Sequence, residues 1–183
     1  MAEDRLDVQP QAPAEIEERG TEPLSRAVLL LGKGFAGLFV ISMVILIYEV
    51  VMRYVFNAPT IWVHETTVFL CAVGFVFGGL HSVSRNGHIR VVLLYDWVSE
   101  RTRRCLDVGI YVACSLATGI FSYALWPTVV KSFWSPSGAF RVVTSGSAWN
   151  PPYPSLLRAF LFVTLIATTL QFAIFAVQRL RGR

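Results

Sequence analysis

Three consecutive segments decide the architecture of this chain: RYVFNAPTIWVHE at residues 53–65, the apolar run Thr66–Val83, and SRNGHIRVVLLYDWVSERTRR at residues 84–104. A helix needs about 20 mainly apolar residues to cross the hydrocarbon core of a membrane, and the central run approaches that length. A polar turn leads into the run, and a basic, amphipathic segment follows it. The stretch therefore predicts a membrane-spanning helix with a polar connection at each end.

The composition extends this prediction to the whole chain. Of its 183 residues, 54% are hydrophobic and 15% are charged, whereas soluble domains average about 45–50% and about 25%. We predict an all-α membrane protein whose membrane domain, residues 24–183, contains four transmembrane helices. Their spans are expected at about 34–52, 61–83, 105–126 and 154–177. Residues 1–23 are acidic and rich in proline, which is typical of a disordered tail.

The distribution of basic residues predicts the orientation. Twelve of the 16 Lys and Arg residues lie before the first span, between the second and third spans, or after the fourth. Because basic residues concentrate on the cytoplasmic side, both termini are expected there. Residues 89–98 are too short to span, and they predict an interfacial amphipathic helix between helices two and three. These charges flank apolar runs instead of covering one folded face, which argues against nucleic-acid binding.

Charged and polar residues gather at the first hairpin. Glu49 and Arg53 are four residues apart, so a helix places them on one face as an ion pair. Thr60 is a plausible N-cap for the second helix, and Trp62 stands where an interfacial aromatic anchor is expected. Glu65 falls in the first turn of that helix, close enough to reach Arg53 across the hairpin. These residues either pin the helix ends or contact a partner.

Small residues suggest where helices approach each other. Gly74 and Gly78 form a GxxxG pattern in the second span, and small residues four apart let a neighbouring backbone come close in lipid. Gly87 and His88 lie in the turn that follows this span. The odd number of cysteines and their spacing give no metal motif.

Little in the sequence predicts catalysis or a cofactor. His64 and His81 would lie at opposite ends of one helix, and His88 lies in a loop, so no haem or metal site is expected. A substrate path inside one subunit usually has charges or broken helices near the membrane midplane, and the middles of all four predicted spans are uncharged. The sequence therefore predicts an interaction module that binds another membrane protein.

Two of these motifs resemble a known family. Arg53-Tyr-Val-Phe-Asn57, followed by Pro59, Trp62 and Glu65, resembles the hairpin signature of the small membrane subunit, Q type, of tripartite ATP-independent periplasmic (TRAP) transporters. The run Gly87–Val91 resembles the second signature of that family. One departure is Val92, because the family often has an acid there, and Asp96 is the nearest substitute.

The resemblance implies a function. It implies pairing with a large multi-span subunit that holds the substrate and sodium sites, in the bacterial inner membrane. A periplasmic binding protein would deliver an organic acid, and sodium flow would drive its uptake. The small subunit would be a fixed scaffold among membrane lipids. Arg53, Asn57, Trp62 and Glu65 would shape its periplasmic end, and Gly87 with His88 its cytoplasmic turn. The alternatives are a membrane anchor subunit of a redox enzyme complex and a self-sufficient small exporter.

Overall fold

The computed structural model describes residues 23–84, 100–135 and 138–180, and these residues form four helices. The helices are α2 (Pro23–Tyr54), α3 (Val63–Ser84), α5 (Glu100–Phe133) and α6 (Tyr153–Leu180). Each is long and apolar enough to cross a membrane. The predicted all-helical architecture with four candidate spans is therefore confirmed.

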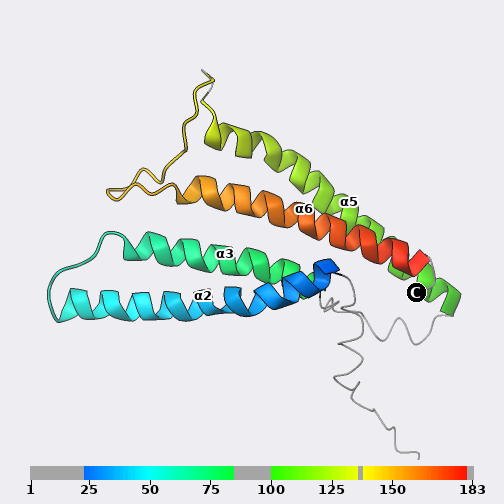
Figure 1. The fold of residues 1–183 in the computed structure, drawn as a ribbon, viewed down its shortest axis with the longest axis horizontal. Coiled ribbons are helices and arrows are strands. Elements are labelled where there is room, and N and C mark those ends of the chain that lie inside the picture. Colours follow the sequence, from blue (N-terminus) through cyan, green and yellow to red (C-terminus); the bar gives the residue numbers. More distant parts are fainter. Residues whose placement is uncertain (1–22, 85–99, 136–137, 181–183) are drawn as a thin grey trace, which may run out of the picture.

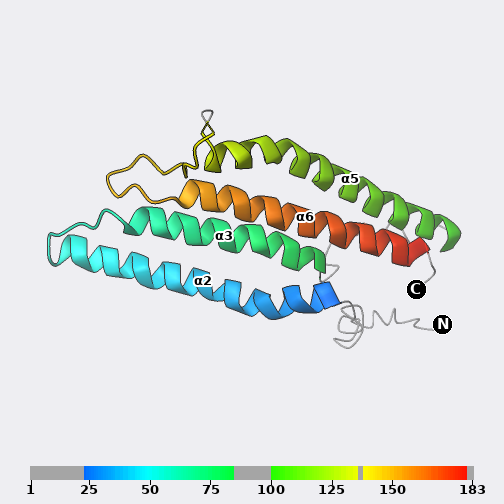
Figure 2. The same cartoon turned by 45° about the horizontal axis from the view of Figure 1, so that its top comes forward.

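The helices lie side by side in the order α2, α3, α6, α5 (Figures 1 and 2). The main packing contacts join α2 to α3, α3 to α6 and α6 to α5. The fold thus consists of two antiparallel hairpins, α2–α3 and α5–α6, which meet along α3 and α6. Helices α2 and α5 form the two edges of this layer.

Two apolar clusters hold the hairpins together, one on each side of the second half of α3. Val28, Phe77 and Leu80 join α2 to α3, and the ring of Phe35 stacks on that of Phe77 with centroids 3.8 Å apart. Phe160 of α6 packs against this cluster. The second cluster joins α3, α5 and α6 through Val83, Tyr111, Phe172 and Ala176.

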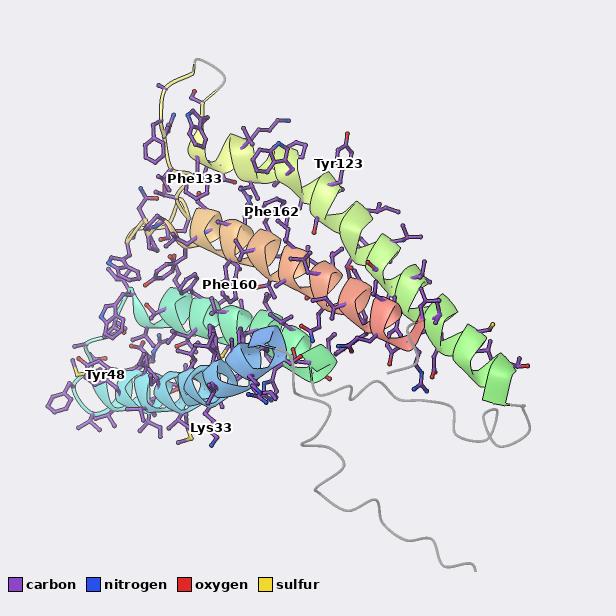
Figure 3. All side chains as sticks on the ribbon, turned by 45° about the vertical axis from the view of Figure 1, so that its right-hand side comes forward. Lys33, Tyr48, Tyr123, Phe133, Phe160 and Phe162 are labelled. Carbon is purple, nitrogen blue, oxygen red and sulfur yellow. The ribbon has the colours of Figure 1, made fainter. Side chains whose placement is uncertain are left out.

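Many large apolar side chains lie on the outside of the layer. Tyr123 on α5 is 82% exposed and points away from the other helices (Figure 3). Phe75 on α3 is also strongly exposed. In water such a surface would be unfavourable, but lipid tails are as apolar as these side chains. The exposed surface is therefore what a membrane-embedded chain requires.

The C-terminal end of α5 lies beyond the end of the predicted third span. The third span was expected to end at about residue 126, yet α5 continues through Pro127 to Phe133. Proline removes one backbone hydrogen bond and disturbs the preceding turn, which bends a helix without necessarily ending it. α5 bends toward its C-terminal end in Figures 1 and 2.

Some predictions fall outside the described residues. Residues 1–22 of the predicted tail, the predicted interfacial helix at residues 89–98, and Gly87 and His88 belong to this group. The orientation of the chain and the exact membrane boundaries stay predictions.

Candidate functional site

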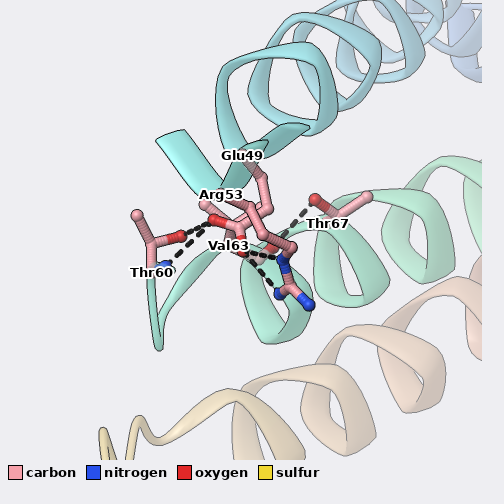
Figure 4. Close-up of polar contacts among 5 residues, drawn as sticks. All are labelled: Glu49, Arg53, Thr60, Val63 and Thr67. Carbon is pink, nitrogen blue, oxygen red and sulfur yellow. Dashed lines mark hydrogen bonds and ion pairs between the residues drawn. The ribbon is translucent and has the colours of Figure 1, made fainter. Parts of the chain in front are cut away.

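The first hairpin is closed by the carboxylate of Glu49, near the end of α2. Arg53, one turn later, donates to Glu49 Oε1 from Nη2 at 2.6 Å and from Nε at 3.2 Å (Figure 4). Glu49 is 9% exposed, whereas the Arg53 side chain is 56% exposed. The predicted ion pair is confirmed, and its acid is the buried member.

The same carboxylate also binds the turn that follows α2. Glu49 Oε2 accepts hydrogen bonds from the Thr60 hydroxyl and from the Thr60 backbone N–H, the latter at 3.1 Å. Hydrogen bonds to a charged group contribute more than neutral ones. Glu49 therefore ties the entry of α3 to the end of α2.

Two predictions at this hairpin are wrong. Thr60 is not the N-cap of α3, because the carbonyl of Trp62 accepts the first helical N–H, that of Thr66, at 3.1 Å. Glu65 does not pair with Arg53 in the structure; its Oε2 atom is buried and accepts no hydrogen bond from a described residue. The reason is helical geometry. Val63, which is 1% exposed, lies beside Glu49 and Arg53 (Figure 4), and Glu65 is turned about 200° away from it.

Asn57 supplies the backbone conformation of the turn. Its φ is +50°, in the left-handed region, which Asn adopts more readily than most residues. This conformation lets the N–H of Ala58 donate to the carbonyl of Met52 at 3.0 Å, closing the end of α2. The prediction of a turn at this position has a specific backbone cause.

Aromatic side chains gather at the same end of the molecule. The ring of Trp62 lies 6.2 Å from that of Tyr48 and 6.5 Å from that of Trp149. Tyr153, at the start of α6, lies 5.5 Å from Trp149 and stacks on Phe69 of α3 at 4.4 Å. Indole and phenol rings favour the depth of lipid headgroups, so this end of the layer has the character of a membrane interface.

The two glycines of the GxxxG pattern have different surroundings. A Cβ at Gly74 would lie 2.8 Å from Cε2 and 2.9 Å from Cζ of Phe39 on α2, so Gly74 makes room for that ring. A Cβ at Gly78 would meet nothing within 4 Å, and Gly78 is exposed. The motif therefore serves one contact inside the chain and leaves its second half on an open face of α3.

Sequence reasoning missed a polar pair at the opposite end of the layer. Asp107 on α5 is 3% exposed, and its Oδ2 accepts hydrogen bonds from Arg179 on α6 at 2.7 and 3.0 Å. Because α5 and α6 are antiparallel, an acid near the start of one and a base near the end of the other reach the same depth. The antiparallel order of two consecutive helices, with an acid at one end and a base at the other, is the sequence signal that could have predicted this pair.

A second missed contact joins the first helix to the last. Gln171 on α6 is fully buried and donates to the hydroxyl of Ser25 on α2 at 2.5 Å. In lipid, polar side chains between helices contribute to association.

Among the described residues no group of three or more His, Cys, Asp and Glu side chains is placed to hold a metal ion.

Fold and site together define a multi-pass helical membrane protein whose polar side chains tie its own helices together. The profile of one family, "Tripartite ATP-independent periplasmic transporters, DctQ component", matches residues 42–182. This match covers well over half of the chain, and the chain belongs to that family. It is a small permease subunit of the TRAP class, located in the bacterial inner membrane.

A curated relative agrees with this assignment. The chain is 35% identical over 91 residues to the C4-dicarboxylate TRAP transporter small permease protein DctQ of Vibrio cholerae serotype O1. The match covers 47% of this chain and 39% of that relative. No solved structure matches. The members of this family are components of transporters, and the comparisons do not support the alternative prediction of a membrane anchor for a redox enzyme.

Proposed function

We propose that this chain is the fixed scaffold of a sodium-driven TRAP transporter that takes up an organic acid delivered by a periplasmic binding protein. One observation supports the scaffold role most directly. The charged residues of the described helices stand near the helix ends, and uncharged stretches of at least fifteen residues separate them, at residues 34–48, 66–84, 108–130 and 159–178. Sodium and carboxylate substrates need polar ligands at depth, so these sites belong to a larger partner subunit.

The orientation follows from the charge distribution. Both termini and the segment between α3 and α5 are assigned to the cytoplasm, and that segment is assigned an interfacial amphipathic helix. The hairpin that contains Arg53, Asn57 and Trp62 then faces the periplasm, as does the connection between α5 and α6. The Asp107–Arg179 pair lies at the cytoplasmic end.

The contact with the large subunit is assigned to the open face of α3. Gly78 is exposed, and no side chain of the described residues lies within 4 Å of where its Cβ would be. An exposed glycine lets the backbone of another helix approach closely in lipid. Gly87 and His88, in the segment after α3, are assigned to the same cytoplasmic contact surface.

Deletion and complementation test this function. Removing the gene for this chain should abolish sodium-dependent uptake of the transported acid, and the wild-type gene on a plasmid should restore it. The tagged chain should also co-purify with a much larger membrane protein. Unimpaired uptake in the deletion strain, or flux through this chain alone in liposomes, contradicts the scaffold role.

A further inference from the structure

A cavity of about 370 Å³ lies between α3 and α6, the two adjacent helices at the centre of the layer (Figure 1). Its apolar lining includes Val68 and Phe69 of α3 and Leu157 of α6. Glu65 is the only acid in this lining, and its Oε2 atom is buried without a hydrogen-bond partner among the described residues. Burying a carboxylate oxygen away from water without a hydrogen-bond partner costs free energy of folding. Because Glu65 as a whole is only partly buried, a ligand in the cavity that carries a cation can approach this carboxylate and offset that cost.

The position of the cavity further limits the class of ligand that it can bind. Tyr153 lines it, and this ring contacts Trp149, which in turn contacts Trp62. These side chains form the aromatic end of the layer, where lipid headgroups are expected. From Glu65, α3 continues through Val68, an exposed apolar residue, toward the middle of the span. A ligand here meets a polar group at the headgroup depth and an apolar wall at the depth of the acyl chains.

We propose that this cavity binds a phospholipid whose headgroup carries a primary ammonium, with the ammonium on Glu65 and an acyl chain along Val68 and Leu157. An ammonium has three N–H donors for the carboxylate, and the ring of Tyr153 favours a nearby cation. His64 and Ser145 are exposed lining residues, and their polar side chains can donate to the lipid phosphate. The proposal concerns this chain alone and does not depend on the transport function.

A lipid fits the cavity better than one basic side chain from a partner. Most of the accessible wall of the cavity is apolar, and Glu65 is its one acid among the described residues. The volume of the cavity exceeds that of a single arginine or lysine side chain. The acyl chain of a lipid fills such a space, and the headgroup ammonium supplies a partner for the carboxylate.

Native mass spectrometry of the full-length chain in detergent tests the proposal. Dioleoyl phosphatidylethanolamine should remain bound, and dioleoyl phosphatidylcholine should bind more weakly because its N-methyl groups cannot donate hydrogen bonds. Dioleoyl phosphatidylglycerol, which lacks the cation, should bind weakest. Glu65→Gln should reduce phosphatidylethanolamine binding by roughly tenfold, and should not reduce the weak phosphatidylglycerol binding. Lys131→Gln, which removes a charge outside this cavity, is the matched control and should change neither.

A second variant keeps the test independent of the charge. Val68→Trp fills the apolar wall from an exposed position, so it should fold normally and still lose phosphatidylethanolamine. Equal binding of the three lipids, or equal phosphatidylethanolamine binding by wild type, Glu65→Gln and Val68→Trp, overturns the proposal. So does a large subunit that co-purifies without bound lipid and cross-links to Glu65 through a basic side chain.

Discussion

The two glycines of α3 offer a sharp test of the packing, because the same substitution meets different neighbours at each. At Gly74 a Cβ would lie 2.8 Å from the ring of Phe39, closer than van der Waals contact allows, and overpacking of this kind costs about 1–3 kcal/mol. At Gly78 a Cβ meets nothing within 4 Å. Any gain in helix propensity, at most about 1 kcal/mol, is common to both sites. Gly74→Ala should therefore be less stable than Gly78→Ala by about 1–3 kcal/mol.

Unfolding of the full-length variants in one detergent, monitored by circular dichroism, measures this difference. Phe39→Leu provides the internal check, since a smaller side chain removes the clash. Combined with Gly74→Ala it should recover most of the loss, giving a coupling of about 1 kcal/mol in a double-mutant cycle. Equal stability of the two alanine variants, or no recovery by Phe39→Leu, would refute the close approach of α2 and α3 at Gly74.

The other predictions concern the polar pairs and the open face. Glu49→Ala should lower the Tm of the isolated chain more than Glu65→Ala does, because Glu49 binds both Arg53 and the turn, whereas Glu65 Oε2 has no hydrogen-bond partner among the described residues; the reverse order would contradict the hairpin geometry. Asp107→Asn should destabilise the chain by about 1–3 kcal/mol, since it weakens a buried charge-assisted contact with Arg179, and chemical unfolding measures this loss. Gly78→Leu should leave the Tm of the chain unchanged but reduce co-purification of the large subunit severalfold, as a pull-down can show.

The sequence was a good guide to whatever depends on composition and local spacing. Four apolar blocks predicted four helices, because the chain in lipid must satisfy its backbone hydrogen bonds within helices. The four-residue spacing of Glu49 and Arg53 predicted their pairing, because adjacent turns of one helix fix that geometry. Both results follow from one element considered alone.

The sequence was a poor guide to contacts between elements. The direction of Glu65 depends on where α3 begins, and a start at Val63 turns this side chain toward α6. Successive side chains in a helix point in directions about 100° apart. An error of two residues in the position of a helix start therefore places a side chain on nearly the opposite face of the helix. The pairing of Asp107 with Arg179 likewise required knowing that α6 packs on α5.

These contacts also explain how a thin layer of helices can serve as a scaffold. Lipid gives no hydrophobic force between helices, so shape and polar contacts must hold them in place. Here Glu49 fixes α2 to the entry of α3, Gln171 fixes α6 to Ser25 of α2, and Asp107 fixes α5 to Arg179 of α6. Together these contacts connect both hairpins near the two ends of the layer, while the uncharged middle stays free to contact lipid or another helix. A rigid frame with an apolar middle is the form that the proposed scaffold role requires.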